Sequence, residues 1–223
     1  MNRASRSFLL LAALFTFGPQ ALPEDRSENH NELPPRINVR VHIYAQGSSE
    51  ILTQAEVEAA EIIGKAGVEI IWTNCYPAGV DLGKAAGCNQ FLGPTNLGVR
   101  ILPYLGVIPG TSKRTMAFAV GNFANVSVRR VREEAAELGV QPYEVLGPAI
   151  AHELGHLLLG QRGHSPKGIM RAHWSLEDYE RAPLGAFRFT REQATVIRDE
   201  VAARTQLAAK SQSGSDSLTA NVK

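Results

Sequence analysis

The sequence has few of the features that mark nucleic-acid-binding or membrane-spanning proteins. Its 23 lysines and arginines are balanced by 22 acidic residues, so the formal net charge is +1 and no basic excess indicates a nucleic-acid partner. We find no internal repeat. The apolar content of 44% and the charged content of 20% are instead those of a globular chain. A length of 223 residues suits one domain with a sizeable core and additional terminal segments.

An apolar run close to the N-terminus, Phe8 to Phe17, is too short to span a bilayer. Two arginines precede it, which is typical of a secretory signal peptide, and no cysteine directly follows to indicate a lipoprotein anchor. An ordinary N-terminal helix is the alternative. We therefore expect a signal peptide over residues 1–22, a linker or leader remnant over 23–36, and a secreted or periplasmic protein with no stable membrane span after cleavage.

Cysteine is scarce, with only Cys75 and Cys88 in the chain, and both lie in a glycine-rich stretch. In an oxidising compartment such a pair is expected to form a disulfide that restrains the loop between them. Metal binding by the two thiols is the alternative, but their spacing matches no common zinc motif.

Hydrophobic periodicity predicts an alternation of strands and helices, followed by a small polar tail over 206–223 that we expect to be disordered. A strand, a helix ended by Gly67 and a second strand form a β-α-β unit, which normally makes a parallel pair. The dipeptide at 121–122, Gly-Asn, is typical of a hairpin turn and predicts one antiparallel strand. The expected strands are 37–44, 68–72, 97–103, 115–120 and 124–131, and the expected helices are 48–67, 131–138, 143–159, a short segment at 175–182, and 190–205.

A possible metal site lies on the long apolar helix predicted over 143–159. His152 and His156 are four residues apart, so their imidazoles lie on one face and both can reach one zinc ion. Glu153 is placed to take a proton from a metal-bound water, which is the HExxH arrangement of zinc peptidases. Such polar groups on a buried helix are costly unless something satisfies them. A pair of hydrogen-bonded core histidines without metal is the alternative.

Catalytic zinc takes a third protein ligand and leaves its fourth position open. The helix is expected to end at Gly160, after which the chain can turn back and bring His164 to the metal. His173 is a further candidate, as are Glu177 and Glu180, because a glutamate from a following helix is the third ligand in another class of HExxH enzymes.

The stretch "HELGHLLLGQRGH", followed by "GIM", resembles the metzincin zinc peptidases over about residues 37–175. The resemblance implies that His152, His156 and His164 bind Zn²⁺ and that Glu153 is the general base. In the family the third histidine follows the second by six residues, whereas here it follows by eight. The loop that contains it is therefore two residues longer than in the family, and loops tolerate such insertions well.

The same resemblance assigns Met170 to the Met-turn beneath the metal. Several metzincins have a tyrosine two residues after this methionine that stabilises the transition state, whereas this chain has Ala172 there, and the neighbouring His173 is a possible substitute donor. The implied fold is of the α/β (α+β) class. It consists of a mixed, twisted five-stranded sheet with an antiparallel edge strand, a backing helix, an active-site helix and a small C-terminal helical part.

Together these features predict a zinc metalloendopeptidase domain over residues 37–205, with a peptide or protein substrate. By the resemblance, a substrate peptide would lie antiparallel along the expected edge strand at 115–120. A non-catalytic exported domain with a structural zinc is one alternative, for which His173 could be a fourth ligand. A zinc hydrolase acting on a non-peptide amide is another, since it would use the same chemistry.

Overall fold

The computed structural model describes residues 33–46, 49–76, 87–106, 112, 114–160 and 163–220. The expected signal peptide and most of the expected linker lie outside the described residues. Clustering of contacts places Leu33–Lys223 in one unit.

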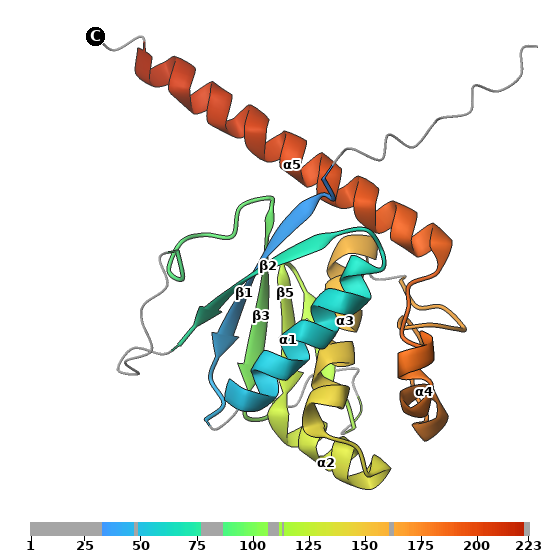
Figure 1. The fold of residues 1–223 in the computed structure, drawn as a ribbon. Coiled ribbons are helices and arrows are strands. Elements are labelled where there is room, and N and C mark those ends of the chain that lie inside the picture. The colour runs from blue at the N-terminus through green and yellow to red at the C-terminus, as the bar shows by residue number, and fades with distance from the viewer. Residues whose placement is uncertain are drawn as a thin grey trace, which may run out of the picture. The chain divides into compact units, whose positions relative to one another are not determined.

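The centre of this unit is a five-stranded mixed sheet (Figure 1). Its strand order is β2-β1-β3-β5-β4, and every neighbouring pair is parallel except β4 with β5, so β4 is the predicted antiparallel edge strand. The mixed α/β fold class is confirmed. The strands are β1 (Arg36–Ile43), β2 (Glu69–Cys75), β3 (Asn96–Leu102), β4 (Ala117–Val120) and β5 (Phe123–Ser127).

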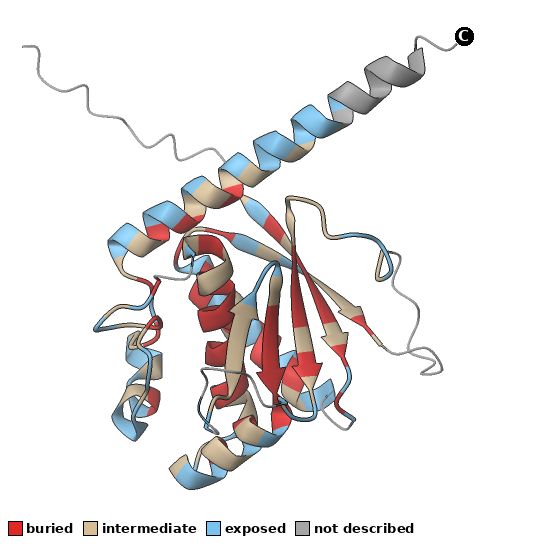
Figure 2. Cartoon of the chain, turned by 180° about the vertical axis from the view of Figure 1, so that it is seen from behind, coloured by how far each residue is buried: buried red, intermediate tan, exposed pale blue. Residues whose placement is uncertain are grey.

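One face of the sheet is covered by α1 (Ser49–Gly64) and α3 (Pro142–Leu159) (Figure 1). Side chains alternate along a strand, so β1 directs every second residue toward these helices. Ile37, Val39 and Val41 are at most 1% exposed and belong to one apolar core with residues of both helices. Figure 2 shows the opposite face of the sheet, with α1 and α3 behind the strands.

The boundary between β5 and α2 (Val128–Leu138) differs from our expectation of a strand that continues to residue 131. Ser127 ends the strand because its hydroxyl accepts a hydrogen bond from the Arg130 amide and so caps the helix. The helix ends where Gly139 adopts a left-handed conformation with φ of 70°.

The C-terminal part consists of α4 (Leu176–Glu180), a 3₁₀ turn (Ala182–Leu184) and α5 (Arg191–Ala220). We expected the last helix to end at 205 and the remainder to be disordered, whereas α5 continues to Ala220. Residues 206–210 are glutamine, leucine, two alanines and lysine, which all favour helix, so the helix continues beyond the end that we expected.

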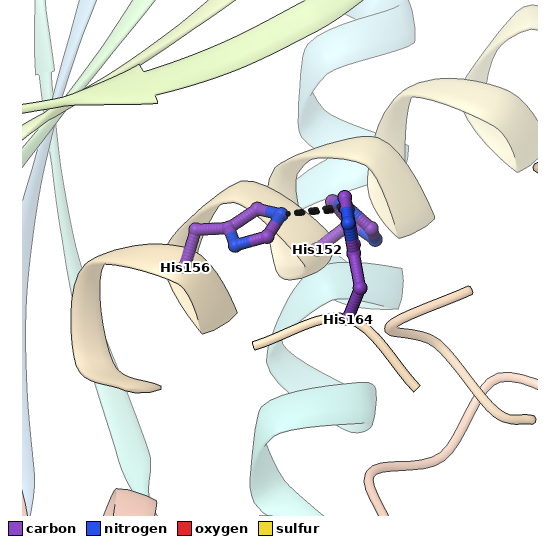
Figure 3. Close-up of side chains that lie close together, drawn as sticks. All are labelled: His152, His156 and His164. Carbon is purple, nitrogen blue, oxygen red and sulfur yellow. Dashed lines mark hydrogen bonds between the residues drawn. The ribbon is translucent and has the colours of Figure 1, made fainter. Parts of the chain in front are cut away.

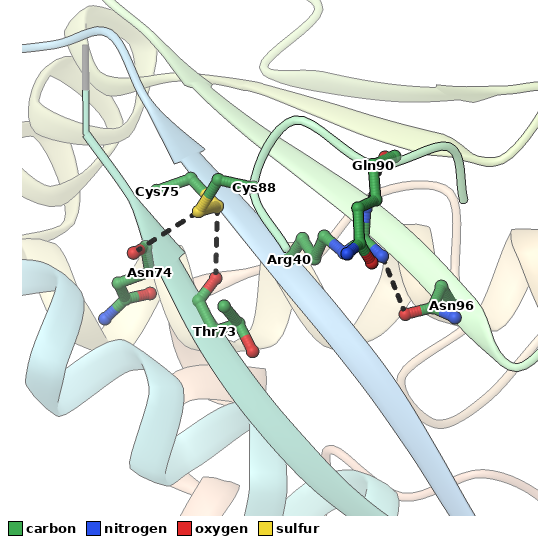
Figure 4. The surroundings of a disulfide bond; sticks show 7 residues. All are labelled: Arg40, Thr73, Asn74, Cys75, Cys88, Gln90 and Asn96. Atoms are coloured by element: carbon green, nitrogen blue, oxygen red, sulfur yellow. Dashed lines mark hydrogen bonds between the residues drawn. A yellow bond between two sulfur atoms is a disulfide. The ribbon is translucent and has the colours of Figure 1, made fainter. Parts of the chain in front are cut away.

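The disulfide between Cys75 and Cys88 is present, as predicted. It joins the end of β2 to the loop that precedes β3 (Figure 4). Among the described residues, no helix is both long and apolar enough to cross a membrane.

Candidate metal centre

The helix α3 forms where the sequence predicts it and carries the proposed site in its last turns. Pro142 occupies its first turn, where a missing amide proton costs nothing, and the Gln141 amide donates to the Glu144 carboxylate at 2.6 Å. Gly160 ends the helix with φ of 79°, a value that favours glycine. Packing against α1 and the sheet buries most of the helix, including His152 and Glu153.

The structure brings together the imidazoles of His152, His156 and His164 (Figure 3). The Nε2 atom of His156 lies 3.1 Å from that of His152 and 3.0 Å from that of His164. His152 Nδ1 lies 2.8 Å from the carbonyl oxygen of Ile169, and the His156 ring is hydrogen-bonded to the backbone of Gly160. With Nδ1 of His152 donating to this carbonyl, its Nε2 keeps a lone pair that faces the other two rings.

Burial favours the neutral form of the two helical histidines. It is the main reason that the pKa of His152 is lowered to about 4; the hydrogen bond to Ile169 acts in the opposite direction, and the nearby His156 and His164 rings contribute smaller lowering effects. Burial and the proximity of His164 also lower the pKa of His156. Neutral imidazole is the form that binds a metal ion.

The geometry of the cluster fits zinc. Zinc–nitrogen bonds of about 2.0–2.1 Å in a tetrahedral site separate two nitrogen ligands by about 3.3 Å. The Nε2 separations of 3.0 and 3.1 Å are close to this value, and one potential ligand atom from each ring lies within 4.8 Å of the others. Three imidazole nitrogen donors suit zinc.

Glu153 directly follows His152 on α3 and is buried. Its side chain is 5% exposed, and its Oε2 atom has no hydrogen-bond partner among the described residues. Burial raises the pKa of this carboxyl to about 8. A divalent cation nearby would favour the charged carboxylate and lower that pKa. A buried carboxyl without a partner is costly in a structural role and is typical of a functional one.

Met170 lies directly against the helix between the two helical histidines. Its side chain is fully buried, and a Cβ atom added to Gly155 would lie 2.6 Å from its sulfur. The amide of Ser165 donates to the Met170 carbonyl at 2.9 Å, which closes the loop that carries His164. Met170 therefore packs against α3, and its assignment to a Met-turn stays a prediction.

Two residues that sequence reasoning missed hold the site together. The Trp174 ring packs edge-on against His152, with ring centroids 5.5 Å apart, and its Nε1 donates to the same Ile169 carbonyl that His152 contacts. Gln193 Nε2 donates to the carbonyl of Gly163, next to His164, at 2.9 Å. Thr190 and Gln193 have the spacing of a helix cap, but nothing in that pattern indicates a contact with a loop thirty residues earlier.

The other candidates from the sequence are not in this cluster. His173 and Glu180 are exposed and are not among the residues that could share the metal. Glu177 is exposed and forms an ion pair with Arg181 at 3.2 Å. Within the described part of the chain, His164 is therefore the residue that accompanies the two helical histidines.

Comparisons with known proteins show structural similarity to solved structures but no matching sequence family. No family model matches the chain, and no curated protein matches its sequence. A solved structure of an archaemetzincin from Methanopyrus kandleri superposes with a TM-score of 0.48 at 19% sequence identity. The superposition covers 75% of this chain and 96% of the archaemetzincin chain.

Proposed function

We propose that this protein is an exported zinc-dependent endopeptidase whose metal ligands are His152, His156 and His164. One observation carries the proposal: three imidazoles converge at α3, and Glu153, the buried residue that directly follows His152, has an Oε2 atom with no hydrogen-bond partner among the described residues. A metal held by three histidines keeps its full positive charge and an open position, which suits hydrolysis.

When bound, zinc would make a water molecule acidic near neutral pH and polarise the carbonyl group of a substrate. The chain's own contribution to the reaction would come from Glu153, whose carboxylate would accept a proton and pass it to the departing amine. Ile169 orients His152 through its carbonyl oxygen. Met170 and Trp174 pack around the ligands and limit their movement.

The edge strand β4 is the proposed binding surface for an extended peptide. It pairs with β5 along one side only, and α3, which carries the site, packs against it. A peptide could form main-chain hydrogen bonds with the other side of β4, which would make recognition depend on backbone shape.

A structural zinc site is less well supported. It would need a fourth protein ligand, and within the described residues the cluster holds three. It would also have no use for the buried carboxyl of Glu153. The proposed role of His173 as a transition-state donor stays a prediction, as do the signal peptide at 1–22 and the domain limits 37–205.

The test compares metal content and peptide cleavage in the purified mature chain and in the Glu153→Gln variant. We expect one zinc per chain in both proteins and cleavage of casein or a quenched peptide by the wild type alone. Glu56→Gln is a matched control, because Glu56 is also a buried glutamate with a pKa raised to about 7 but has Asn74 as its partner. This control should cleave normally.

A zinc-loaded wild type that cleaves no peptide substrate would refute the peptidase proposal. Cleavage of a small non-peptide amide in a parallel assay would then favour the alternative hydrolase. The ligand set is tested separately with His164→Ala, which should bind zinc far more weakly. Unchanged zinc affinity in that variant would remove His164 from the site.

A further inference from the structure

The face of the sheet opposite α1 and α3 is turned toward the viewer in Figure 2. Basic and aromatic side chains lie close together on this face. The residues of β1 that alternate with its core residues point to this face, among them Arg40 and His42. In the strand register, Arg40 is opposite Gly98, and His42 is opposite Arg100. Gly98 is in turn opposite Phe123. Residues from three neighbouring strands therefore form one surface.

Gly98 leaves room for an aromatic ring to lie across β3. A Cβ atom at this position would lie 2.3 Å from two ring atoms of Phe123, so any larger residue would displace the ring. The guanidinium carbon of Arg100 lies 3.7 Å from the centre of this ring, and His42 is a further neighbour with ring centroids 6.1 Å apart. Stacking on Phe123 holds the guanidinium in place without a hydrogen bond.

The disulfide loop forms a wall of this surface. Cys88 is fixed to the end of β2, and the residues after it approach β1 (Figure 4). Arg40 donates to the carbonyl oxygen of Gln90 at 2.5 Å and to the side chain of Asn96 at 3.4 Å. Both of these acceptors are neutral, so the loop orients Arg40 without neutralising its charge.

The positive charge here has no counterpart in the described residues. Arg40 is only 8% exposed, yet neither it nor Arg100 forms an ion pair with a described carboxylate. Arg100 and His42 also lack hydrogen-bond partners within the described ranges. Both arginines act with burial to lower the pKa of His42. A buried arginine without an anion is costly, and a bound anion would relieve the cost.

Arg40, His42 and Phe123 line a pocket of about 440 Å³, and Arg100 lies beside it, over the ring of Phe123. Besides Arg40, His42 and Phe123 it is lined by the amide side chains of Asn89 and Asn122. The same pocket is bounded by Phe91, whose side chain is 100% exposed although it is large and apolar. An apolar ring of that kind at the edge of a basic pocket suits a ligand that has an apolar part next to its charge.

We propose that this pocket is a second binding site, separate from the metal centre, for a small anion that carries an apolar ring. Arg40 and Arg100 would bind its carboxylate or phosphate group, because guanidinium matches such planar or branched anions. The amide side chains would donate further hydrogen bonds. Phe91 would pack on the ring and be shielded from water.

Phenyl phosphate, inorganic phosphate and benzylamine are suitable probes for titration of the purified protein. Calorimetry gives the affinity, and the NMR resonances of the His42 ring report on the pocket itself. We expect phenyl phosphate to bind best, inorganic phosphate at least threefold more weakly, and benzylamine, a cation, not at all. No change at His42 up to about 10 mM phenyl phosphate would overturn the proposal.

Variants distinguish a built site from general attraction to a basic surface. Arg100→Gln should weaken the binding of phenyl phosphate at least tenfold. Arg36→Gln is the matched control, because it removes the same charge from β1 at a residue that already pairs with Glu69. Phe91→Ala should weaken the binding of phenyl phosphate without affecting the binding of inorganic phosphate. Because the Phe91 side chain is fully exposed, this substitution should not disturb folding. Equal losses in the two arginine variants would refute the site.

Asp81 lies in the segment between Cys75 and Cys88, outside the described residues, and we test whether its carboxylate competes for the pocket. The Asp81→Asn variant tests this. Binding of phenyl phosphate that appears only in this variant would mean that the chain fills its own pocket and would overturn the proposal. Similar affinity in the variant and the wild type supports an external ligand.

Discussion

Replacement of Gly155 by alanine should destabilise the protein, although alanine is the better helix former. The new Cβ would lie 2.6 Å from the Met170 sulfur and 2.8 Å from a ring carbon of Phe189, and the two side chains are only 0% and 9% exposed. Both separations are about 1 Å below a favourable contact. Overpacking of this kind costs about 1–3 kcal/mol, against a helix-propensity gain of at most about 1 kcal/mol.

With the full propensity gain subtracted, the expected net loss is up to about 2 kcal/mol, which lowers Tm by up to roughly 8 °C in a domain of this size. Gly64→Ala is the matched control, since Gly64 is also helical but a Cβ atom there would have nothing within 4 Å. Its Tm should stay the same or rise. Thermal unfolding of both variants, followed by circular dichroism, measures the difference.

The same substitution should weaken zinc binding, because a displaced Met170 moves the adjacent Ile169 carbonyl that orients His152. Competition with a chromogenic chelator measures this affinity. A Gly155→Ala protein with the Tm and zinc affinity of the wild type would show that Met170 can move aside freely, and it would refute the argument that this packing holds the site rigid.

Three further perturbations have defined outcomes. Gln193→Glu keeps the acceptor that caps α5 but loses the donor to the carbonyl of Gly163 beside His164. Zinc affinity should therefore fall about two- to tenfold with little change in Tm. A large fall in Tm would instead mean that the substitution disrupts the helix cap. Replacing Cys75 and Cys88 by serine should cost up to about 3 kcal/mol in urea unfolding, because the bridge closes a short loop with a sequence separation of 13; an unchanged midpoint would contradict this. Burial raises the pKa of Glu56 to about 7, so the native state binds more protons than the unfolded state, and its stability falls as pH rises from about 4.5 through 7. Glu56→Gln should therefore be more stable than the wild type at pH 8, by the order of 1 kcal/mol after solvent screening, and this difference in stability should vanish near pH 4. A difference that does not change with pH would show that the titration of Glu56 is not its cause.

Local patterns in the sequence predicted most of the fold. The alternation in β1, the turn between β4 and β5 and the proline and glycine at the ends of α3 each depend on neighbouring residues, and each element formed as expected. The end of β5 was misplaced because Ser127 reads equally well as a strand residue or a helix cap. The length of α5 was missed because polarity was taken as a sign of disorder.

For the candidate site too, some residues could be predicted from local sequence and others could not. His152, Glu153 and His156 could be found from helical spacing alone, and His164 from its proximity in sequence. The roles of Trp174 and Gln193 could not, because each depends on a contact between segments whose approach no local pattern specifies.

The loop of His164 has a consequence for the order in which the site is assembled. The two histidines on α3 are brought together by the helix itself, four residues apart, whereas His164 depends on partners that come later in the chain. The Ile169 amide donates to the carbonyl of Arg188, and Gln193 holds Gly163. A nascent chain that ends before residue 188 has the first two ligands but nothing to hold the third. Tight metal binding should therefore be the last event of folding, so the proposed peptidase activity would arise only after the chain has folded.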